Sequence, residues 1–328
     1  MRAADDAAEA LTYVAPGRAE IRPLPLPARG DGMVEVETRW SALSRGTERL
    51  VFAGRVPASE HARMRAPFQA GDFPFPVVYG YAAAGVVRAG PAALLGRAVF
   101  ALYPHQTRAR LPAEAVVPLP DGLALRRAPL AANLETALNV VWDAAIGPGD
   151  RVAVVGGGVL GLMVAAIASA IPGAAVTVVD VRDDRAETAA ALGARFALPG
   201  EAPGDQDCVI HTSASEQGLA TALDLAGHEA TVVEASWFGD ARPQVPLGGA
   251  FHSRRLVLRS SQVGEVPAAR RARWSRRRRL EAALALLCDP KFDRLVTAEV
   301  PFDRLPESLP DLLGEHAAGL AAVVRYPG

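Results

Sequence analysis

A glycine-rich stretch carries the clearest chemistry in this sequence. The six residues that begin at Gly156 read GGGVLG, directly after the apolar run VAVV and directly before a helix-like segment. Gly156, Gly158 and Gly161 fit the pattern G-x-G-x-x-G, which permits a tight turn, close approach of a pyrophosphate and close helix packing. Val159 and Leu160 then begin a helix whose first N–H groups are free to bind phosphate. The stretch therefore predicts a dinucleotide-binding loop.

An acidic residue follows at the spacing that such a loop requires. Asp180 ends the next apolar run, AVTVV, about twenty residues after the glycines, where a carboxylate binds a ribose 2′-hydroxyl and repels a 2′-phosphate. The sequence thus predicts NAD as the cofactor, in preference to NADP. Val181, Arg182 and Arg185 belong to the same predicted cofactor-binding set, and the two arginines partly offset the repulsion. The alternative, a glycine-rich turn without a cofactor, is disfavoured by this context.

The segments around these residues predict two kinds of domain. Short apolar runs between proline and glycine turn signals recur in the first third of the chain, with period-two alternation in MVEVET, and predict a small antiparallel barrel or sandwich. Further on, strands alternate with helices, which predicts a parallel sheet with helices on both faces. Strands are expected at 152–155, 176–180, 207–211 and 230–235, and helices at 160–170, 185–192 and 218–226. The tail reads as strand, helix and strand, and can return to the first domain.

The composition limits the classes of function. The chain has 328 residues, of which 50% are hydrophobic, enough for two cores. Its net charge of −1 gives no global field that would recruit nucleic acid or an acidic membrane. Two cysteines, Cys208 and Cys288, are too few for a disulfide framework and favour a reduced, cytoplasmic setting. Asp5, Asp6 and Glu9 stand where a signal peptide would need an apolar core.

Two other segments allow competing interpretations. The uncharged run from Val152 to Val179 is long enough to span a membrane, but its glycine and proline punctuation favours a strand–helix–strand unit. Residues 270–279, RRARWSRRRR, form the only strong charge cluster. We interpret this run as a solvated helix start or loop. Recruitment of an anionic substrate is the second interpretation, and nucleic-acid binding is the least favoured one.

The whole pattern resembles the medium-chain dehydrogenase/reductase superfamily. The resemblance rests on the barrel-like first half, on GGGVLG with its acidic partner, and on the runs DQDCVIHTSAS and LAGHEATVVEASWFG. It implies a GroES-like β-barrel catalytic domain at residues 1–128 and 292–328, a Rossmann domain at 129–291, and a homodimer formed through the edges of the Rossmann sheets. Residues 41–57, SALSRGTERLVFAGRVP, together with FPFPVVYGY, resemble more narrowly the branch that includes bacteriochlorophyllide hydroxyethyl dehydrogenase.

Zinc-dependent members of that superfamily carry a Cys-Gly-Thr-Asp-like element, a Gly-His-Glu element and a further ligand on a helix. By this resemblance the ligand positions are held by Arg45, Tyr81, Ala82 and Ala132. Zinc requires Cys, His or carboxylate donors, so the resemblance implies a member without the metal. The run FPVVYGYAAAGVV then looks like a metal-site strand whose ligands have been replaced.

Without a metal, the reacting oxygen must be polarised by hydrogen-bond donors or by a cation. The candidates are Arg45 as a fixed charge, Thr47 in the family's proton-relay position, Tyr81 as a phenol donor, and His105 as an acid or base. Glu48 is expected to orient Arg45. The competing interpretations are a buried Arg45–Glu48 ion pair, a core role for Tyr81 and a solvated or capping role for His105.

The resemblance implies further cofactor contacts after the later strands. They are expected from Thr136, from Thr212 and Ser213 after the fourth Rossmann strand, and from Ser236 and Trp237 after the next.

These features predict an NAD-dependent, zinc-independent oxidoreductase that acts on an alcohol/carbonyl pair of a small or medium metabolite, which can be anionic. One alternative is a reductase of an activated C=C bond, of the quinone or enone type; Asp180 counts against it, because most such relatives prefer NADPH. The other is a non-catalytic NAD(H)-binding redox sensor. His211 is not expected to be a catalyst, and no nucleic-acid or membrane partner is expected.

Overall fold

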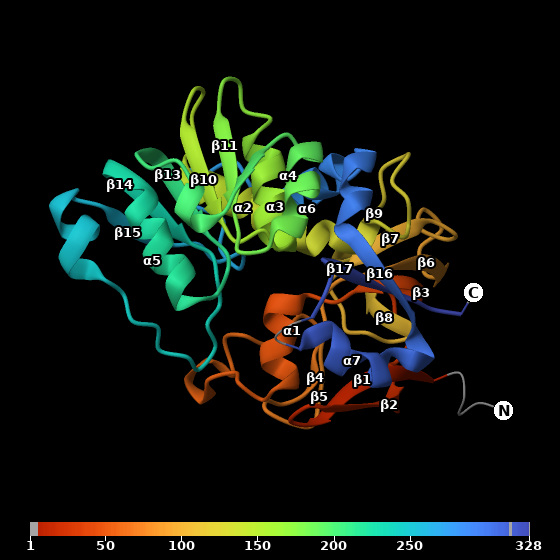
Figure 1. Ribbon diagram of the computed structural model, residues 1–328. Coiled ribbons are helices and arrows are strands. Elements are labelled where there is room, and N and C mark those ends of the chain that lie inside the picture. Colours follow the sequence, from red (N-terminus) through yellow and green to blue (C-terminus); the bar gives the residue numbers. More distant parts are fainter. Residues whose placement is uncertain (1–5, 315–316, 328) are drawn as a thin grey trace. The chain divides into compact units, whose positions relative to one another are not determined.

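The chain forms two compact units in the computed structural model, which describes residues 6–314 and 317–327 (Figure 1). One unit, here the segmented unit, combines the N-terminal part up to Ala132 with the C-terminal part from Leu284. The other, here the parallel unit, extends from Asn133 to Ala283. The start of the acidic N-terminal segment, with Asp5, lies outside the described residues.

The segmented unit holds two sheets and brings both ends of the chain together. The smaller sheet has the order β2-β1-β5-β4; the larger has the order β16-β17-β3-β6-β7-β9, and β8 also pairs with β3. The strands are β1 (Ala7–Ala15), β2 (Arg18–Pro25), β3 (Met33–Ala42), β4 (Ala70–Gly71), β5 (Val77–Val78), β6 (Ala83–Ala89), β7 (Ala98–Ala101), β8 (Arg108–Pro112), β9 (Val117–Pro118), β16 (Val296–Pro301) and β17 (Ala321–Arg325). Strand β17 is antiparallel to β3, so the C-terminal tail returns to the first part of the chain as expected.

Two α-helices and five short helical turns complete the segmented unit as described. Helix α7 lies beside α1 and β2 (Figure 1). The helices are α1 (Arg45–Phe52) and α7 (Leu305–Leu313), and the turns are η1 (Ala58–Glu60), η2 (Ala113–Ala115), η3 (Ala128–Leu130), η7 (Pro290–Leu295) and η8 (Phe302–Arg304). The core of the larger sheet follows the alternation of MVEVET: Val34 and Val36 of β3 are fully buried, together with Val87, Val99 and Leu111.

The run FPVVYGYAAAGVV is not one strand, which corrects the expectation from sequence. Strand β5 pairs with β1 and β4 in the smaller sheet, whereas β6 pairs with β3 and β7 in the larger one. Between them Gly80 has φ = +129°, and a Cβ atom there would lie 2.7 Å from Cδ2 of His105. The chain therefore changes sheets at a position that only glycine occupies without strain.

The parallel unit is built on a six-stranded sheet with the order β12-β11-β10-β13-β14-β15, in which every neighbouring pair is parallel. This order corresponds to 3-2-1-4-5-6, the order of the Rossmann fold. The strands are β10 (Arg151–Val155), β11 (Ala175–Val179), β12 (Arg195–Ala197), β13 (Gln206–His211), β14 (Ala226–Glu234) and β15 (Val257–Ser260). The predicted fold class, α/β with a separate sheet domain, is confirmed.

Helices connect these strands and extend to the boundaries of the unit. They are α2 (Ala131–Ala144), α3 (Val159–Ala168), α4 (Ala186–Ala191), α5 (Glu216–Leu225) and α6 (Arg276–Leu286), with the short turns η4 (Asp183–Arg185), η5 (Pro199–Glu201) and η6 (Leu247–Phe251). The uncharged run weighed as a membrane span forms β10, α3 and β11, so the strand–helix–strand interpretation is correct. Within residues 6–314 and 317–327, no helix has the length and apolar character to cross a membrane.

The basic run is only partly a solvated helix start. Arg276 begins α6 and pairs with Glu265, and both side chains are exposed. Arg279, three residues later, is 1% exposed, and its Nε donates to Oε1 of Glu135 at 2.9 Å. Its other N–H groups bind Asn139 and backbone carbonyls. Burial raises the pKa of Glu135, and the charge of Arg279 opposes that rise. The solvated interpretation is therefore wrong for Arg279, which anchors α6 to α2.

Removal of Arg279 should destabilise the fold. Arg279→Ala leaves the buried Glu135 carboxylate without its cation, and we expect a loss of about 3–5 kcal/mol in the free energy of unfolding. The matched control is Arg278→Ala, whose exposed guanidinium lies 4.0 Å from the ring centre of Trp274. That variant should lose less than about 1 kcal/mol. Urea denaturation measures both; equal losses in the two variants would contradict the anchoring role.

Candidate functional site

The glycine loop of the parallel unit is tight at its ends and open in the middle. Gly156 follows β10 with φ = +113°, and a Cβ atom on Gly161 would lie 1.8 Å from the carbonyl oxygen of Gly156. A Cβ atom on Gly158 would meet nothing within 4 Å. Gly158 is also the N-cap of α3 and offers no side chain to its N–H groups. The loop therefore fits a pyrophosphate, which can approach the backbone at Gly158 and bind the helix N-terminus.

The carboxylate of Asp180 lies against this loop. Its Oδ2 accepts a hydrogen bond from the N–H of Gly157 at 2.5 Å, and Oδ1 accepts one from the N–H of Arg182 at 2.9 Å. A carboxylate has about four acceptor positions, so Asp180 can still accept a bond from a ribose hydroxyl. Asp180 is thus tied to the glycine loop at the end of β11, and its role in ribose recognition stays a prediction.

The two arginines near Asp180 form ion pairs with Asp184. Nη2 of Arg182 lies 2.7 Å from Oδ2 of Asp184, and this bond is the main reason why the pKa of Arg182 is raised. Nε of Arg185 lies 3.4 Å from the same carboxylate, and burial lowers the pKa of its guanidinium. Their charges are thus partly balanced before any ligand binds. Val181, also predicted to contact the cofactor, is 80% exposed beside them.

The other predicted cofactor residues lie in different places. Thr212 donates from Oγ1 to the carbonyl of Gly156 at 2.9 Å, which ties the end of β13 to the glycine loop. Ser236, after β14, accepts a bond from the N–H of Ala214 at 3.0 Å. Thr136 is on α2, and Trp237 lies in the irregular segment after β14. Val159 and Leu160 form the first turn of α3.

A cluster of three hydroxyl groups surrounds the start of α1 in the segmented unit. The phenol of Tyr81 donates to Oγ of Ser44 at 2.5 Å and lies 3.1 Å from Oγ1 of Thr47. Tyr81 and Thr47 are half-buried. Burial raises the pKa of Tyr81, against the effect of these two hydrogen bonds, so the phenol keeps its proton at neutral pH. Sequence reasoning missed Ser44, although a serine directly before RGTE is a typical helix N-cap.

Glu48 is a buried hydrogen-bond acceptor and does not form the expected pair with Arg45. Its Oε2 accepts from the hydroxyl of Tyr13 at 2.8 Å and lies 3.0 Å from Nε2 of His105. Its Oε1 accepts from the N–H of Ser44 at 2.7 Å. Both Glu48 and His105 are almost fully inaccessible to solvent. The carboxylate therefore holds the first turn of α1, and with it the hydroxyl cluster.

His105 links this buried network to Ser41 and, through it, to Tyr326. Its Nδ1 lies 2.7 Å from Oγ of Ser41, which lies 3.0 Å from the hydroxyl of Tyr326. Burial raises the pKa of Tyr326 well above its ordinary value. The interpretation of His105 as a solvated loop residue is wrong, because the residue is 1% exposed. Nothing in YPHQT alone shows that its histidine contacts Ser41 of β3 and Glu48 of α1.

Arg45 binds the backbone of the C-terminal segment. Its guanidinium donates to the carbonyl oxygens of Ala317 at 2.7 Å and Gly319 at 2.9 Å. Arg45 is on the half-buried side of α1, whereas Glu48 is on its buried side, which explains why the two side chains have different partners. The other positions aligned with zinc ligands, Ala82 and Ala132, are buried and have no donor atoms in their side chains. In the part of the chain that the structure describes, no group of three or more His, Cys, Asp or Glu side chains is placed to hold a metal ion.

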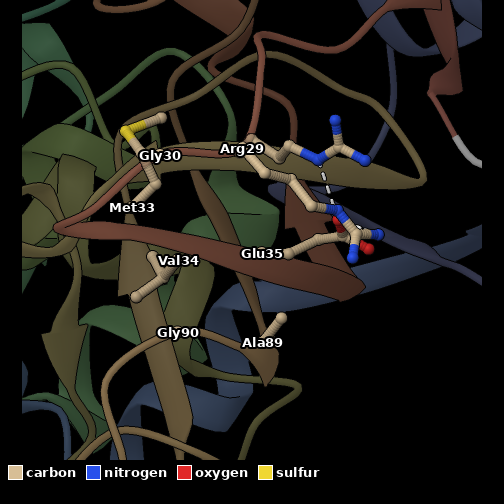
Figure 2. Close-up of a pocket in the computed structure, with 8 residues that line it drawn as sticks. Arg29, Gly30, Met33, Val34, Glu35, Ala89 and Gly90 are labelled. Atoms are coloured by element: carbon tan, nitrogen blue, oxygen red, sulfur yellow. Dashed lines mark hydrogen bonds and ion pairs between the residues drawn. The ribbon is translucent and has the colours of Figure 1, made fainter.

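A shallow pocket of about 180 Å³ in the segmented unit shares no residue with these groups. Its charged side chains pair with one another: Nε of Arg110 donates to Oε2 of Glu35 at 2.8 Å, and Arg29, labelled near Glu35 in Figure 2, lies 3.3 Å from the same carboxylate. The rest of the lining is apolar or glycine, with Met33 and Val34 of β3. The pocket holds none of the predicted cofactor or catalytic residues and is not the candidate site.

Comparison with known proteins agrees with this architecture. The family model of the alanine dehydrogenase/PNT C-terminal domain matches residues 143–233. A curated protein of Haemophilus influenzae, an uncharacterized zinc-type alcohol dehydrogenase-like protein, is 36% identical over 217 residues. That alignment covers 62% of this chain and 59% of the relative.

Solved structures with the same fold cover the whole chain at low sequence identity. The 2R,3R-butanediol dehydrogenase of Bacillus subtilis has a TM-score of 0.76 at 17% identity, covering 98% of this chain and 100% of that one. A short chain alcohol dehydrogenase from Escherichia coli CFT073, complexed with NADH, has a TM-score of 0.76 at 16% identity, covering 98% and 99%. A protein from Sinorhizobium meliloti 1021, bound to NADP, has a TM-score of 0.75 at 17% identity, covering 97% and 99%.

The chain therefore shares the fold of these solved dehydrogenases over almost its whole length, and over part of its length it is similar in sequence to a zinc-type alcohol dehydrogenase-like protein.

Proposed function

We propose that this protein is a zinc-independent oxidoreductase that transfers a hydride between NAD(H) and an alcohol/carbonyl pair of a small or medium metabolite. The observation that carries the proposal is the open loop at Gly158, between Gly156 and Gly161, with the carboxylate of Asp180 bound to its backbone. A bound nicotinamide would supply or accept the hydride. A cytoplasmic location belongs to the same proposal and is supported by the two free cysteines, Cys208 and Cys288.

Preference for NAD over NADP follows from the charges around the loop. Asp180 presents a carboxylate where a ribose 2′-substituent is expected, and a 2′-phosphate would be repelled by it. Arg182 and Arg185 are the nearest cations, but both pair with Asp184. The relatives bind either NADH or NADP, so the preference rests on these side chains alone.

Zinc independence follows from the donor set. Arg45, Tyr81, Ala82 and Ala132 do not fit zinc, which takes thiolate, imidazole or carboxylate ligands. In place of a Lewis acid, the hydroxyl cluster of Tyr81, Ser44 and Thr47 offers proton donors at the half-buried start of α1. A donor placed at the developing charge of an oxygen contributes to the rate in the same way as a weak electrophile. The cluster favours an oxidoreductase over a non-catalytic sensor.

A homodimer is part of the proposal and is supported by the free edge of the Rossmann sheet. Strand β15 is the last in the strand order, and all four of its residues are exposed. They include Val257 at 45% and Leu258 at 39% exposure. An exposed apolar edge strand is a ready template for pairing with a second chain.

The cofactor preference should appear directly in binding. We expect NADH to bind at least about tenfold more tightly than NADPH, a difference of about 1.4 kcal/mol. Asp180→Ala should narrow the difference, because it removes both the hydroxyl acceptor and the repulsion. Fluorescence titration of both dinucleotides measures this, with Asp224→Ala, an exposed acidic residue on α5, as the control. Equal or tighter binding of NADPH by the unaltered protein would refute the preference.

The metal-free hydroxyl cluster should be visible in metal content and turnover. The purified protein should hold no stoichiometric zinc, and its turnover should survive chelation. Tyr81→Phe and Thr47→Val should each lower turnover by about 10²-fold or more, as expected for a lost acid or oxyanion donor, without weakening dinucleotide binding.

The matched control for the cluster is Tyr79→Phe, which removes a phenol hydroxyl from the ring that packs edge-on against Tyr81. Turnover of this variant should stay near that of the unaltered protein. One zinc per chain, or full turnover in both cluster variants, would refute the assignment.

The oligomeric state tests the free edge. The protein should be a dimer at micromolar concentration by light scattering, and the double variant Val257→Asp, Leu258→Asp should be a monomer, because two charges on the edge strand oppose pairing. Leu95→Asp, at a leucine of the segmented unit that is 56% exposed, should leave the dimer intact. A monomeric unaltered protein would exclude the proposed assembly.

A further inference from the structure

A histidine–carboxylate pair lies at the edge of the parallel sheet and has no part in the proposed function so far. His211 is the last residue of β13, and its Nδ1 lies 2.6 Å from Oε2 of Glu234, the last residue of β14. Nε2 of the same ring lies 2.6 Å from Oγ of Ser213. The imidazole is fully buried, whereas the side chain of Glu234 is 16% exposed.

Glu234 is the charged partner of this imidazole. Glu234 is further held by the N–H of Ser236, which donates to Oε1 at 2.7 Å. Within the described residues, the other hydrogen-bonding and ring partners of this imidazole are uncharged: Oγ of Ser213 and Ser236, and the ring of Phe238, with the backbone of Gly218 on α5 close to Nε2. Glu216, in the first turn of α5, is an exposed carboxylate that accepts a bond from the N–H of Gln244. Protonation of His211 therefore decides whether the pair has a net charge.

Along the strand order, this pair and Asp180 lie on opposite sides of strand β10. Asp180 follows β11 on one side of β10, and β13 and β14 lie on the other side. A dinucleotide with its pyrophosphate at the start of α3 and one ribose at Asp180 must extend its other nucleoside over the ends of β13 and β14. Thr212, next to His211, is bound to the carbonyl of Gly156 in the glycine loop.

We propose that the His211–Glu234 pair makes the choice between oxidised and reduced nicotinamide dinucleotide depend on pH. This proposal rests on the proposed function. With a neutral imidazole the pair carries one negative charge, which favours the positively charged oxidised nicotinamide. With a protonated imidazole the pair has no net charge, and that preference disappears. The uncharged reduced ring should be nearly indifferent to the change. His211 acts here as a positioning residue through the field at the ring and takes no part in hydride transfer.

The first test compares the dissociation constants of NAD+ and NADH at about pH 6 and about pH 8.5, a range in which histidine changes charge. We expect the ratio of the NAD+ constant to the NADH constant to be about fivefold or more higher at the lower pH, the lower end of typical couplings between sites. His211→Gln should make the ratio independent of pH. The control is His228, an exposed histidine on β14, the strand that also carries Glu234. His228→Gln should leave the pH dependence of the ratio unchanged.

A second measurement records protons directly. Calorimetric titrations near neutral pH, in two buffers of different ionisation enthalpy, should show proton release when NAD+ binds and almost none when NADH binds. The release should be absent in His211→Gln. Glu234→Gln provides an independent variant: it should weaken NAD+ binding at high pH while NADH binding is kept.

The outcomes separate this inference from the proposed function. Dinucleotide binding with the same ratio at both pH values, or with equal pH dependence in the unaltered protein and His211→Gln, would overturn the role of the pair alone. Absence of any binding of NAD+ or NADH would overturn the proposed function together with it.

Discussion

The structure of the parallel unit depends on one constraint: the N-terminus of α3 must stay open at the point where the strand order reverses. The first N–H groups of a helix need partners, and a side-chain cap is the usual one. Here Gly158 offers none, and Gly156 and Gly161 pack so closely that Gly161 has no room for a Cβ atom. Asp180 holds the loop from one side, and Thr212 holds it from the other. The unit thus keeps the first turn of α3 without a side-chain cap at the carboxyl edge of its sheet.

In the segmented unit the central constraint is the burial of the carboxyl group of Glu48. An unpaired buried charge is very costly, but Glu48 accepts three donors, from Tyr13, Ser44 and His105. These partners come from a strand of the smaller sheet, the start of α1 and the loop before β8. The network that satisfies the charge therefore also fixes the hydroxyl groups at the start of α1. A structural need and a candidate reactive cluster share the same few side chains.

The name of the Haemophilus influenzae relative refers to zinc, but the residues of this chain at the corresponding positions differ from zinc ligands. The fold is shared over almost the whole length, but folds host different chemistries, and the chemistry depends on the side chains present. Arg45 binds backbone carbonyls, and Tyr81 donates to serine and threonine hydroxyls. In the proposed function, a site with these groups would polarise an oxygen through hydrogen bonds, where a zinc site would do so through a metal bond.

Local patterns in the sequence determined the parallel sheet, the glycine loop and the acidic residue after β11. Alternation of apolar runs with helices, and glycines at fixed spacing, act over a few residues, so they can be read without tertiary structure. The sequence also showed which donors are missing at the zinc positions.

Only the tertiary structure decided which polar groups meet. His105 and Glu48, or Arg279 and Glu135, are far apart in the chain and are brought together by strand pairing and helix packing. The break of the FPVVYGYAAAGVV run follows from the pairing of its two strands in different sheets, and the ring of His105, from another segment, lies against Gly80 at the break. His211 and Glu234 meet because parallel strands end at the same edge of the sheet. The burial and the pairing of a charged side chain depend on such long-range contacts. A charged residue that the sequence alone suggests is exposed to solvent can therefore be buried and paired in the fold.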